Sequence, residues 1–323
     1  MSKPKIALTW FSSCGGCEES ILDLGEGLLE LASRMDIVFW PIALDYKLEA
    51  VARLGDGELL ATLVNGAIRT VDHSRQADLF RKKSKYVVAH GSCAHIGGVV
   101  GLGNLHSNTE LLRTVYLDTS IVDNPRSLLP GLDPEPLPGD MELTPLRHSV
   151  APLDRVVPVD YYLPGCPPPP ELVEKTLRML LEGTLPPIGS TLADSRALCD
   201  TCPRRPTLPE RIAIKRFKRL HEVPWDPGIC FLTQHLVCMG PVTRGGCQAR
   251  CINGNIPCRG CFGPPDGVHD QGAKAVAFLA SLMDAEEAEE AAAVANTLPD
   301  LLGLVSQYGL AASVLQRKEK GAS

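Results

Sequence analysis

The hydrophobic positions in the first half of the chain follow two spacings. Short apolar runs typical of buried strands occupy residues 6–10, 36–40, 59–64, 86–90 and 156–163. Between and after them, helical patterns cover residues 18–34, 76–83 and 169–181. The last pattern has prolines near its start and Gly183 just past its end, as helices prefer. Strands that alternate with helices predict an α/β fold with a doubly wound parallel sheet.

The pattern changes in the second half. Residues 124–152 are rich in Pro and Leu and predict a long irregular insertion, and residues 185–189 predict a linker. Beyond the linker, Gly, Pro and Cys replace periodic apolar positions until a helical pattern returns from Gly272. We therefore expect a sheet domain over residues 1–188. An irregular Cys-rich domain with a helical C-terminal tail should follow over residues 189–323.

Composition narrows the classes of function. The 323-residue chain has twelve cysteines and a formal net charge of −6, which argues against a general nucleic-acid binder. No apolar run approaches the roughly 18 residues of a membrane span. The sequence opens on a strand pattern and not on a signal segment, so we expect a cytoplasmic protein. In that reducing compartment, cysteines predict metal binding or catalysis more than disulfides.

Four cysteines follow predicted strands. This first set, in which the opening pair is a Cys-X-X-Cys turn with two glycines, comprises Cys14, Cys17, Cys93 and Cys166. Because the carboxyl ends of parallel strands meet at one edge of a sheet, we expect the four thiols to converge there. Thiolates ligate both iron–sulfur clusters and zinc.

The other eight cysteines lie between residues 199 and 261. Grouped by nearest neighbours, they form a second set of Cys199, Cys202, Cys230 and Cys238, and a third set of Cys247, Cys251, Cys258 and Cys261. Neither set has the compact bacterial ferredoxin spacing. One alternative is a zinc ribbon built from the first two and the last two of these eight, across an unusually long gap. Another is a thioredoxin-like redox pair at Cys14 and Cys17, although the aromatic-flanked motif of that family is missing.

Three motifs resemble the small subunits of NiFe hydrogenases. They are Cys14-Gly-Gly-Cys-Glu-Glu-Ser20, Gly91-Ser-Cys-Ala94 and Pro164-Gly-Cys-Pro-Pro168. The resemblance spans nearly the whole chain and is strongest to the cytoplasmic methyl-viologen-reducing type and related electron-bifurcating hydrogenases. It implies a flavodoxin-like N-terminal domain, in agreement with the alternation of strands and helices.

The resemblance also implies three 4Fe–4S clusters with cysteine ligands only. By position, the first set holds the proximal cluster, the third set the medial cluster and the second set the distal cluster. The membrane-linked uptake class has histidine where Cys199 stands, and proline where Cys251 stands. Cysteine at both positions favours lower reduction potentials and low-potential acceptors.

The implied function is electron relay within a soluble NiFe hydrogenase, an oxidoreductase. Every cysteine is already assigned, so the NiFe centre is expected in a partner large subunit, and this chain has no expected catalytic residue. A further redox subunit would be ferredoxin-like, heterodisulfide-reductase-like or a NAD-linked flavoprotein. The alternative function is an electron-transfer subunit related to the small quinone-site subunit of respiratory complex I. That subunit is shorter and lacks the eight additional cysteines. A zinc-stabilised interaction protein is a third possibility.

Several other residues carry weaker signals. Glu18 and Glu19 stand where the family has a glutamate that passes protons, although an acid is also favourable at a helix N-terminus. His90 and His95 flank Cys93 and could hydrogen-bond to the proximal cluster or fill structural roles. Residues 210–221 predict a basic amphipathic helix, either a solvated face or a docking face for an acidic partner near the distal cluster. The glycines at 101 and 103 do not complete a dinucleotide motif, and there is no P-loop.

Overall fold

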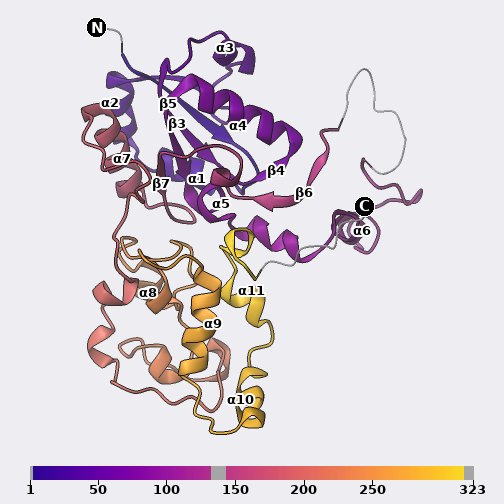
Figure 1. Ribbon diagram of the computed structural model, residues 1–323, viewed down its shortest axis with the longest axis vertical. Coiled ribbons are helices and arrows are strands. Elements are labelled where there is room, and N and C mark those ends of the chain that lie inside the picture. Colours follow the sequence, from indigo (N-terminus) through magenta and orange to yellow (C-terminus); the bar gives the residue numbers. More distant parts are fainter. Residues whose placement is uncertain (1–2, 132–142, 316–323) are drawn as a thin grey trace.

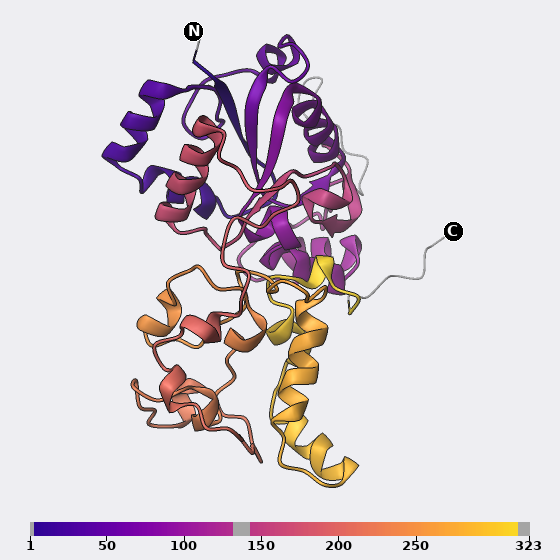
Figure 2. The ribbon, with the colours of Figure 1, turned by 60° about the vertical axis from the view of Figure 1, so that its left-hand side comes forward.

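The chain folds into two lobes (Figures 1 and 2). The computed structural model of the protein describes residues 3–131 and 143–315. One lobe is built around the parallel sheet, and the other contains the Cys-rich segment and the C-terminal helices. None of the helices in these described residues combines the length and apolarity that crossing a bilayer requires.

The sheet has five parallel strands in the order β2-β1-β3-β5-β7. These strands are β1 Lys5–Trp10, β2 Asp36–Phe39, β3 Leu59–Asn65, β5 Ser84–His90 and β7 Tyr161–Leu163. This is the flavodoxin order, so the predicted fold class is confirmed. The fifth strand is shorter than the predicted residues 156–163, because residues 153–155 form a 3-10 turn and Pro158 has no N–H to donate.

Helices cover both faces of the sheet, as buried parallel strands require. On one face lie α1 Gly16–Leu22, α2 Glu26–Arg34 and α7 Pro170–Glu182, and on the other lie α3 Leu48–Ala52 and α4 Val71–Lys83. The prediction of one helix over residues 18–34 is wrong in its continuity, because Gly25 adopts a positive φ of 54° between α1 and α2. The α7 helix ends at Gly183 in the left-handed conformation, as predicted.

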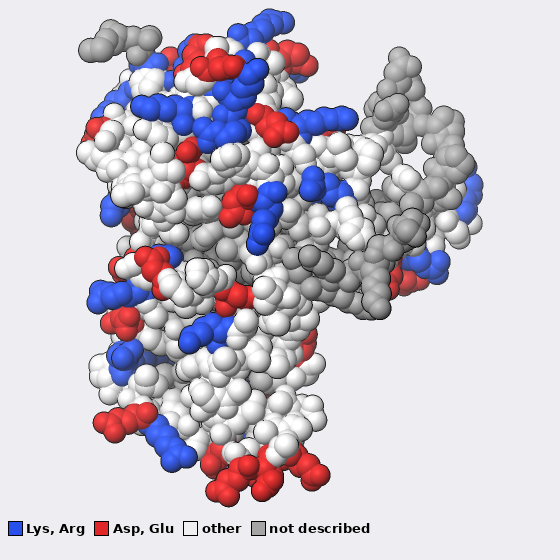
Figure 3. Space-filling view, in the orientation of Figure 1, with Lys and Arg blue, Asp and Glu red and all other residues white. Residues whose placement is uncertain are grey.

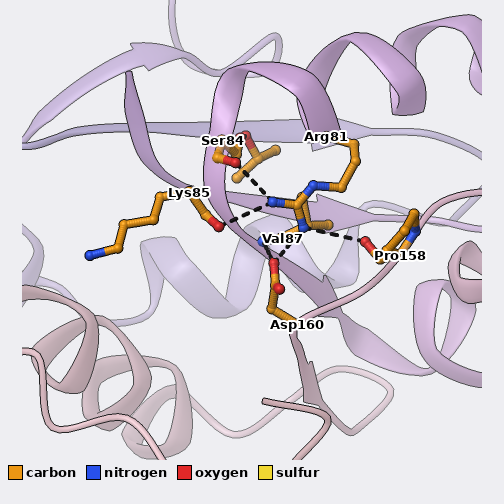
Figure 4. A network of polar contacts seen from close by, with 7 residues as sticks. Arg81, Ser84, Lys85, Val87, Pro158 and Asp160 are labelled. Atoms are coloured by element: carbon orange, nitrogen blue, oxygen red, sulfur yellow. Dashed lines mark hydrogen bonds and ion pairs between the residues drawn. The ribbon is translucent and has the colours of Figure 1, made fainter. Parts of the chain in front are cut away.

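An arginine network fixes the approach to β7 (Figure 4). From the last turn of α4, Arg81 forms an ion pair with Asp160 and donates to the carbonyl of Ser84 at 2.8 Å. Asp160 in turn accepts from the backbone N–H of Val87 at 2.7 Å. These contacts hold the segment before β7 against β5, and thereby position the loop that carries Cys166.

The segment between β5 and β7 contains several regular elements. It contains α5 Gly91–Ile96, the 3-10 helix η1 Val99–Leu105 and α6 Asn108–Tyr116, which begins with a capping box of Ser107 and Glu110. Strand β6 Leu146–Ala151 pairs antiparallel with β4 Ile68–Thr70. The expectation of an irregular tract over residues 124–152 is therefore wrong for residues 146–151, and residues 132–142 lie outside the described part.

The second lobe has its own apolar core and little regular structure before its C-terminal helices. Short 3-10 turns η3 to η7 occupy residues 198–201, 205–207, 220–222, 232–234 and 240–242. They precede α8 Arg250–Asn253, α9 Gln271–Ser281, α10 Ala288–Ala295, α11 Leu301–Val305 and η8 Leu310–Ala312. The core packs Phe217 and Phe231 against α9 residues such as Leu279. The predicted helical tail is confirmed.

The predicted basic helix over residues 210–221 is wrong. Ile214 N donates to the carbonyl of Leu282 at 2.8 Å, and Lys218 N donates to the carbonyl of His235 at 3.0 Å. Residues 214 and 218 form β-bridges to these neighbouring segments. Because the backbone bonds are made to distant parts of the chain, they are not available for a helix, and only residues 220–222 form a 3-10 turn.

The two lobes meet at the sheet edge that carries the first cysteine set. The hydroxyl of Ser92 donates to the carbonyl of Cys261, and Arg250 forms an ion pair with Glu171 at 2.6 Å. Gly97 allows Ala311 of η8 to approach closely, since a Cβ at residue 97 would collide with the Ala311 side chain. These contacts bring the third cysteine set next to the first.

Candidate functional site

The first cysteine set converges at the carboxyl edge of the sheet. Cys14 follows β1, Cys17 lies in the first turn of α1, Cys93 lies in α5 directly after β5, and Cys166 follows β7. Cys17 and Cys93 are buried, whereas Cys14 is exposed. The four cysteines therefore lie at the sheet edge where the strand ends predicted them.

The thiols of the first set influence one another electrostatically. Burial, and after it the thiols of Cys93 and Cys166, raise the pKa of Cys17. Burial, and then Cys166 and Cys14, raise the pKa of Cys93 to about 12. Buried thiols of this kind lose their protons readily only when a cation such as iron compensates the charge. Because Cys14 and Cys17 stand beside two further thiols, they do not form the isolated pair of a thioredoxin-like site.

Two glycines make room for these thiols. A Cβ on Gly91 would collide with the Sγ of Cys17, and a Cβ on Gly98 would collide with the Sγ of Cys93. Both glycines have positive φ, of 84° and 60°. The backbone therefore approaches the sulfurs closely at this edge, and the local geometry fits four thiolates around an inorganic group.

The second set gathers within the Cys-rich lobe. Burial raises the pKa of Cys199 to about 12, and the thiols of Cys238, Cys202 and Cys230 add to the effect. Gly240 lies against two of these sulfurs, since its Cβ would stand 3.2 Å from the Sγ of Cys199 and 3.6 Å from that of Cys238. The zinc-ribbon alternative is wrong in its pairing, because Cys199 interacts with this set and not with Cys258 or Cys261.

The third set lines a cavity between the lobes. The cavity has a volume of about 240 Å³, and its walls include Tyr308 and the thiol-bearing residues Cys166, Cys247, Cys251, Cys258 and Cys261. Burial raises the pKa of Cys261 to about 12, with smaller contributions from Cys247, Cys166 and Cys251. The donors and the space fit a cluster with four cysteine ligands.

The three sets form a row. Cys166 of the first set interacts electrostatically with Cys261 of the third. At the other end of the third set, Cys238 of the second set raises the pKa of Cys258, after burial. Met239 N also donates to the carbonyl of Cys258 at 2.9 Å. The third set therefore stands between the other two.

No three His, Cys, Asp or Glu side chains in the described residues converge tightly enough to hold a single metal ion. That finding concerns single ions. In a 4Fe–4S cluster each thiolate binds a different iron, so its four sulfurs need not converge on one point.

A buried carboxylate adjoins the first set. Glu18 is 1% exposed, and its carboxylate accepts hydrogen bonds from the Nε1–H of Trp40 and, at 3.1 Å, from the Nδ2–H of Asn65. Burial raises the pKa of Glu18, and these two hydrogen bonds oppose the rise. Glu19 is exposed. No pattern in the sequence points to Trp40 or Asn65, because both lie on other strands or loops.

Two histidines flank Cys93, of which His90 is buried and His95 is half-buried. Neither ring nitrogen of His90 has a hydrogen-bond partner among the described residues, and burial lowers its pKa to about 4. Burial, with a smaller effect of Arg244, lowers the pKa of His95 to about 3, and its ring lies 4.8 Å from that of Tyr162. Buried ring nitrogens without partners at this edge fit a site in which a bound group supplies the missing hydrogen-bond partner.

Comparisons with known proteins agree with this site. The family model described as "NADH ubiquinone oxidoreductase, 20 Kd subunit" matches residues 14–180. The iron–sulfur G subunit of the F420-non-reducing hydrogenase of Archaeoglobus profundus is 34% identical over 319 residues, covering 97% of this chain and 98% of the relative. The vhu G subunit of the F420-non-reducing hydrogenase of Methanocaldococcus jannaschii is 35% identical over 316 residues, covering 98% of both chains.

The fold has solved counterparts as well. A chain of the [NiFeSe] hydrogenase from Desulfovibrio vulgaris Hildenborough superposes with a TM-score of 0.52 at 17% identity, covering 83% of this chain and 96% of that one. The sheet, the Cys-rich lobe and the full-length relatives together define a hydrogenase small subunit. Within that class, the chain belongs to the family of G subunits of F420-non-reducing hydrogenases. It is accordingly part of an oxidoreductase complex.

Proposed function

We propose that the chain holds three 4Fe–4S clusters and relays single electrons through a NiFe hydrogenase. The first set would hold the proximal cluster, the third set the medial cluster and the second set the distal cluster. The observation that carries this proposal is the row of three thiol sets: Cys166 and Cys261 line one cavity, and Met239, next to Cys238, donates to the carbonyl of Cys258 at 2.9 Å. When bound, such clusters supply one-electron chemistry, and the thiolates fix their order along the row.

The large subunit with the NiFe centre would bind at the end of the row that the first set occupies. Cys14 is exposed there. The indole of Trp10 lies beside Gly15 of the same loop and is 43% exposed, although tryptophan side chains are usually highly buried. An exposed aromatic side chain next to a ligand thiol supports a protein partner that covers this edge.

The low-potential character of the acceptor rests on the ligands. All donors in the three sets are cysteines, with no histidine at 199 and no proline at 251. We infer four-iron clusters throughout and an acceptor of low potential or a flavin. This acceptor would belong to a further subunit of a cytoplasmic complex. That subunit would be ferredoxin-like, heterodisulfide-reductase-like or a NAD-linked flavoprotein. The sheet domain over residues 1–188 would carry the proximal cluster, and residues 189–323 the other two.

The match to the complex I subunit ends at residue 180, before the second and third sets begin. The hydrogenase relatives, by contrast, cover 97% and 98% of the chain. The complex I alternative therefore accounts for the first set alone, and we prefer the hydrogenase assignment.

Metal analysis tests the proposal directly. Protein purified without oxygen should contain about twelve irons and matching acid-labile sulfide per chain, with interacting 4Fe–4S signals in the EPR spectrum of the dithionite-reduced sample. One or two zinc ions per chain with little iron would refute the three-cluster relay. About four irons would leave only the first set occupied and would favour the complex I-like alternative.

A further inference from the structure

An open groove lies on the Cys-rich lobe and reaches Leu102 of the sheet lobe. It has a volume of about 500 Å³ and lies between residues 217–220, residues 256–259 and the start of α11. Its apolar lining includes Phe217, Leu236 and Leu298, and Ile256 at its wall is 48% exposed. Phe217, Leu236 and Leu298 are themselves buried, so the solvent-exposed apolar surface of the groove comes from Ile256 at its wall.

Three cations surround the groove. They are Lys218, Arg219 and Arg259, and none of them forms a salt bridge with a described residue. Glu222 accepts a hydrogen bond from the backbone N–H of Arg219, and Arg259 donates to Gln307 at 3.2 Å. The one acid that lines the groove, Asp300, already accepts from Gly303 N at 2.9 Å. The groove therefore carries excess positive charge beside apolar surface.

Neighbouring cations in the same segment are paired. Lys215 forms an ion pair with Asp284 at 3.7 Å, and Arg216 forms one with Glu222 at 3.1 Å. The next two cations in the chain, Lys218 and Arg219, line the groove instead. Acidic side chains gather instead at the tip of the lobe around the start of α10 (Figure 3), where Glu286, Glu287, Glu289 and Glu290 are exposed.

The groove borders the ligands of two cysteine sets. Arg259 stands between Cys258 and Cys261 of the third set, and Val237, which also lines the groove, precedes Cys238 of the second. A molecule in the groove would therefore lie beside the third set and close to Cys238 of the second set.

We propose that this groove docks an acidic electron-carrier protein, whose carboxylates meet Lys218, Arg219 and Arg259 around an apolar centre. The proposal rests on the relay proposed above and adds the partner's chemistry and its place. Charge complementarity of this kind orients a partner and accelerates its encounter. Hydrogen oxidised at the large subunit supplies two electrons and two protons, and the carrier takes the electrons one at a time.

The test uses the complete hydrogenase heterodimer and an acidic 2[4Fe–4S] ferredoxin as the probe. Hydrogen-dependent ferredoxin reduction is measured for the wild type, for Lys218→Glu/Arg219→Glu, and for the matched control Lys215→Glu/Arg216→Glu. The two variants change charge equally within one short segment. Methyl viologen reduction and iron content report separately on the relay itself.

We expect the groove variant to raise the KM for ferredoxin by about tenfold or more, while viologen reduction and iron content are retained. The control should stay near the wild type, and the wild-type KM should rise with ionic strength. A wild type that does not reduce ferredoxin, a KM without salt dependence, or equal effects of both variants would overturn the proposal. So would unchanged ferredoxin kinetics with binding of flavin mononucleotide lost only in the groove variant, which would indicate a small-molecule site.

Failure of this proposal is distinguishable from failure of the relay. If viologen reduction and iron content are absent in the wild type, the relay is wrong. If both are present and only the ferredoxin results disagree, the docking site is wrong and the relay stands.

Discussion

Neighbouring glutamates next to the first set differ entirely in environment. Glu18 is buried and accepts hydrogen bonds from Trp40 and Asn65, whereas Glu19 is exposed to water. Glu18 also raises the pKa of Cys17 electrostatically, although burial and the thiols of Cys93 and Cys166 are larger causes. A negative charge held in a poorly solvated place acts on a nearby redox group much more strongly than one in water.

Replacing Glu18 by glutamine should raise the reduction potential of the proximal cluster, on the order of tens of millivolts, because a nearby negative charge disfavours reduction. A glutamine amide fits the same place. Its oxygen accepts from Trp40, and its NH2 group donates to the Oδ1 of Asn65 after the Asn65 amide rotates. This Oδ1 has no partner among the described residues. EPR-monitored redox titration measures the potential. Glu19→Gln is the control and should leave it unchanged; an equal shift in both variants would contradict this role.

His90 should make stability depend on pH. Its pKa is about 4 in the folded chain, against 6.5 as the ordinary value, so below about pH 6.5 the unfolded state binds more protons. Stability should therefore fall as the pH drops from 6.5 toward 4. His90→Leu should remove about 2 kcal/mol of the loss between pH 7 and pH 5. Anaerobic urea unfolding at the two pH values checks this, and parallel losses in wild type and variant would contradict it.

At the scale of elements, strand ends and short helices place the cysteines of the first set. The sheet order brings the loops after β1, β5 and β7 to one edge, and α5 begins at Gly91 directly after β5. Gly91 is required there for two reasons, its φ of 84° and its closeness to the Sγ of Cys17. The strand-to-helix junction is therefore part of the site.

Substituting Gly91 by alanine should displace the Cys17 thiol and cost the proximal cluster. Iron should fall by about four per chain, while the other two clusters keep their EPR signals. Gly57→Ala is the matched control, because Gly57 has a similar φ of 71° but open space around its Cβ position. It should show backbone strain of about 1 kcal/mol and full iron content. Full iron in Gly91→Ala would contradict the close-contact argument.

At the scale of the whole molecule, two lobes share one row of thiols. The Cys-rich lobe docks on the sheet edge through Ser92 with Cys261 and through Arg250 with Glu171. This docking places the third set between the first and the second. In the proposed relay, electrons that enter at the sheet edge would pass the third set before they reach the second.

Removal of one ligand in the middle of the row should slow the whole relay. We expect Cys251→Ala to lose about one iron per chain and to show a three-iron EPR signal in the oxidised state. Hydrogen-dependent dye reduction by the heterodimer should fall, although the proximal cluster still reduces. Asn253→Ala, on the same short helix, is the control. A dye reduction rate equal to that of the wild type would contradict this prediction and show that the Cys251 ligand does not limit the relay.

The sequence by itself determined the flavodoxin-like alternation, the helical tail and the strand-end positions of the first set, because these depend on local spacing and on a general rule of parallel sheets. Tertiary structure alone decided the rest. The segment over residues 210–221 has amphipathic spacing yet is extended, because its backbone bonds to Leu282 and His235 replace helical ones. The partners of Glu18, the groove beside the third set and the order of the three sets likewise come from contacts between residues far apart in the chain, which local patterns do not encode.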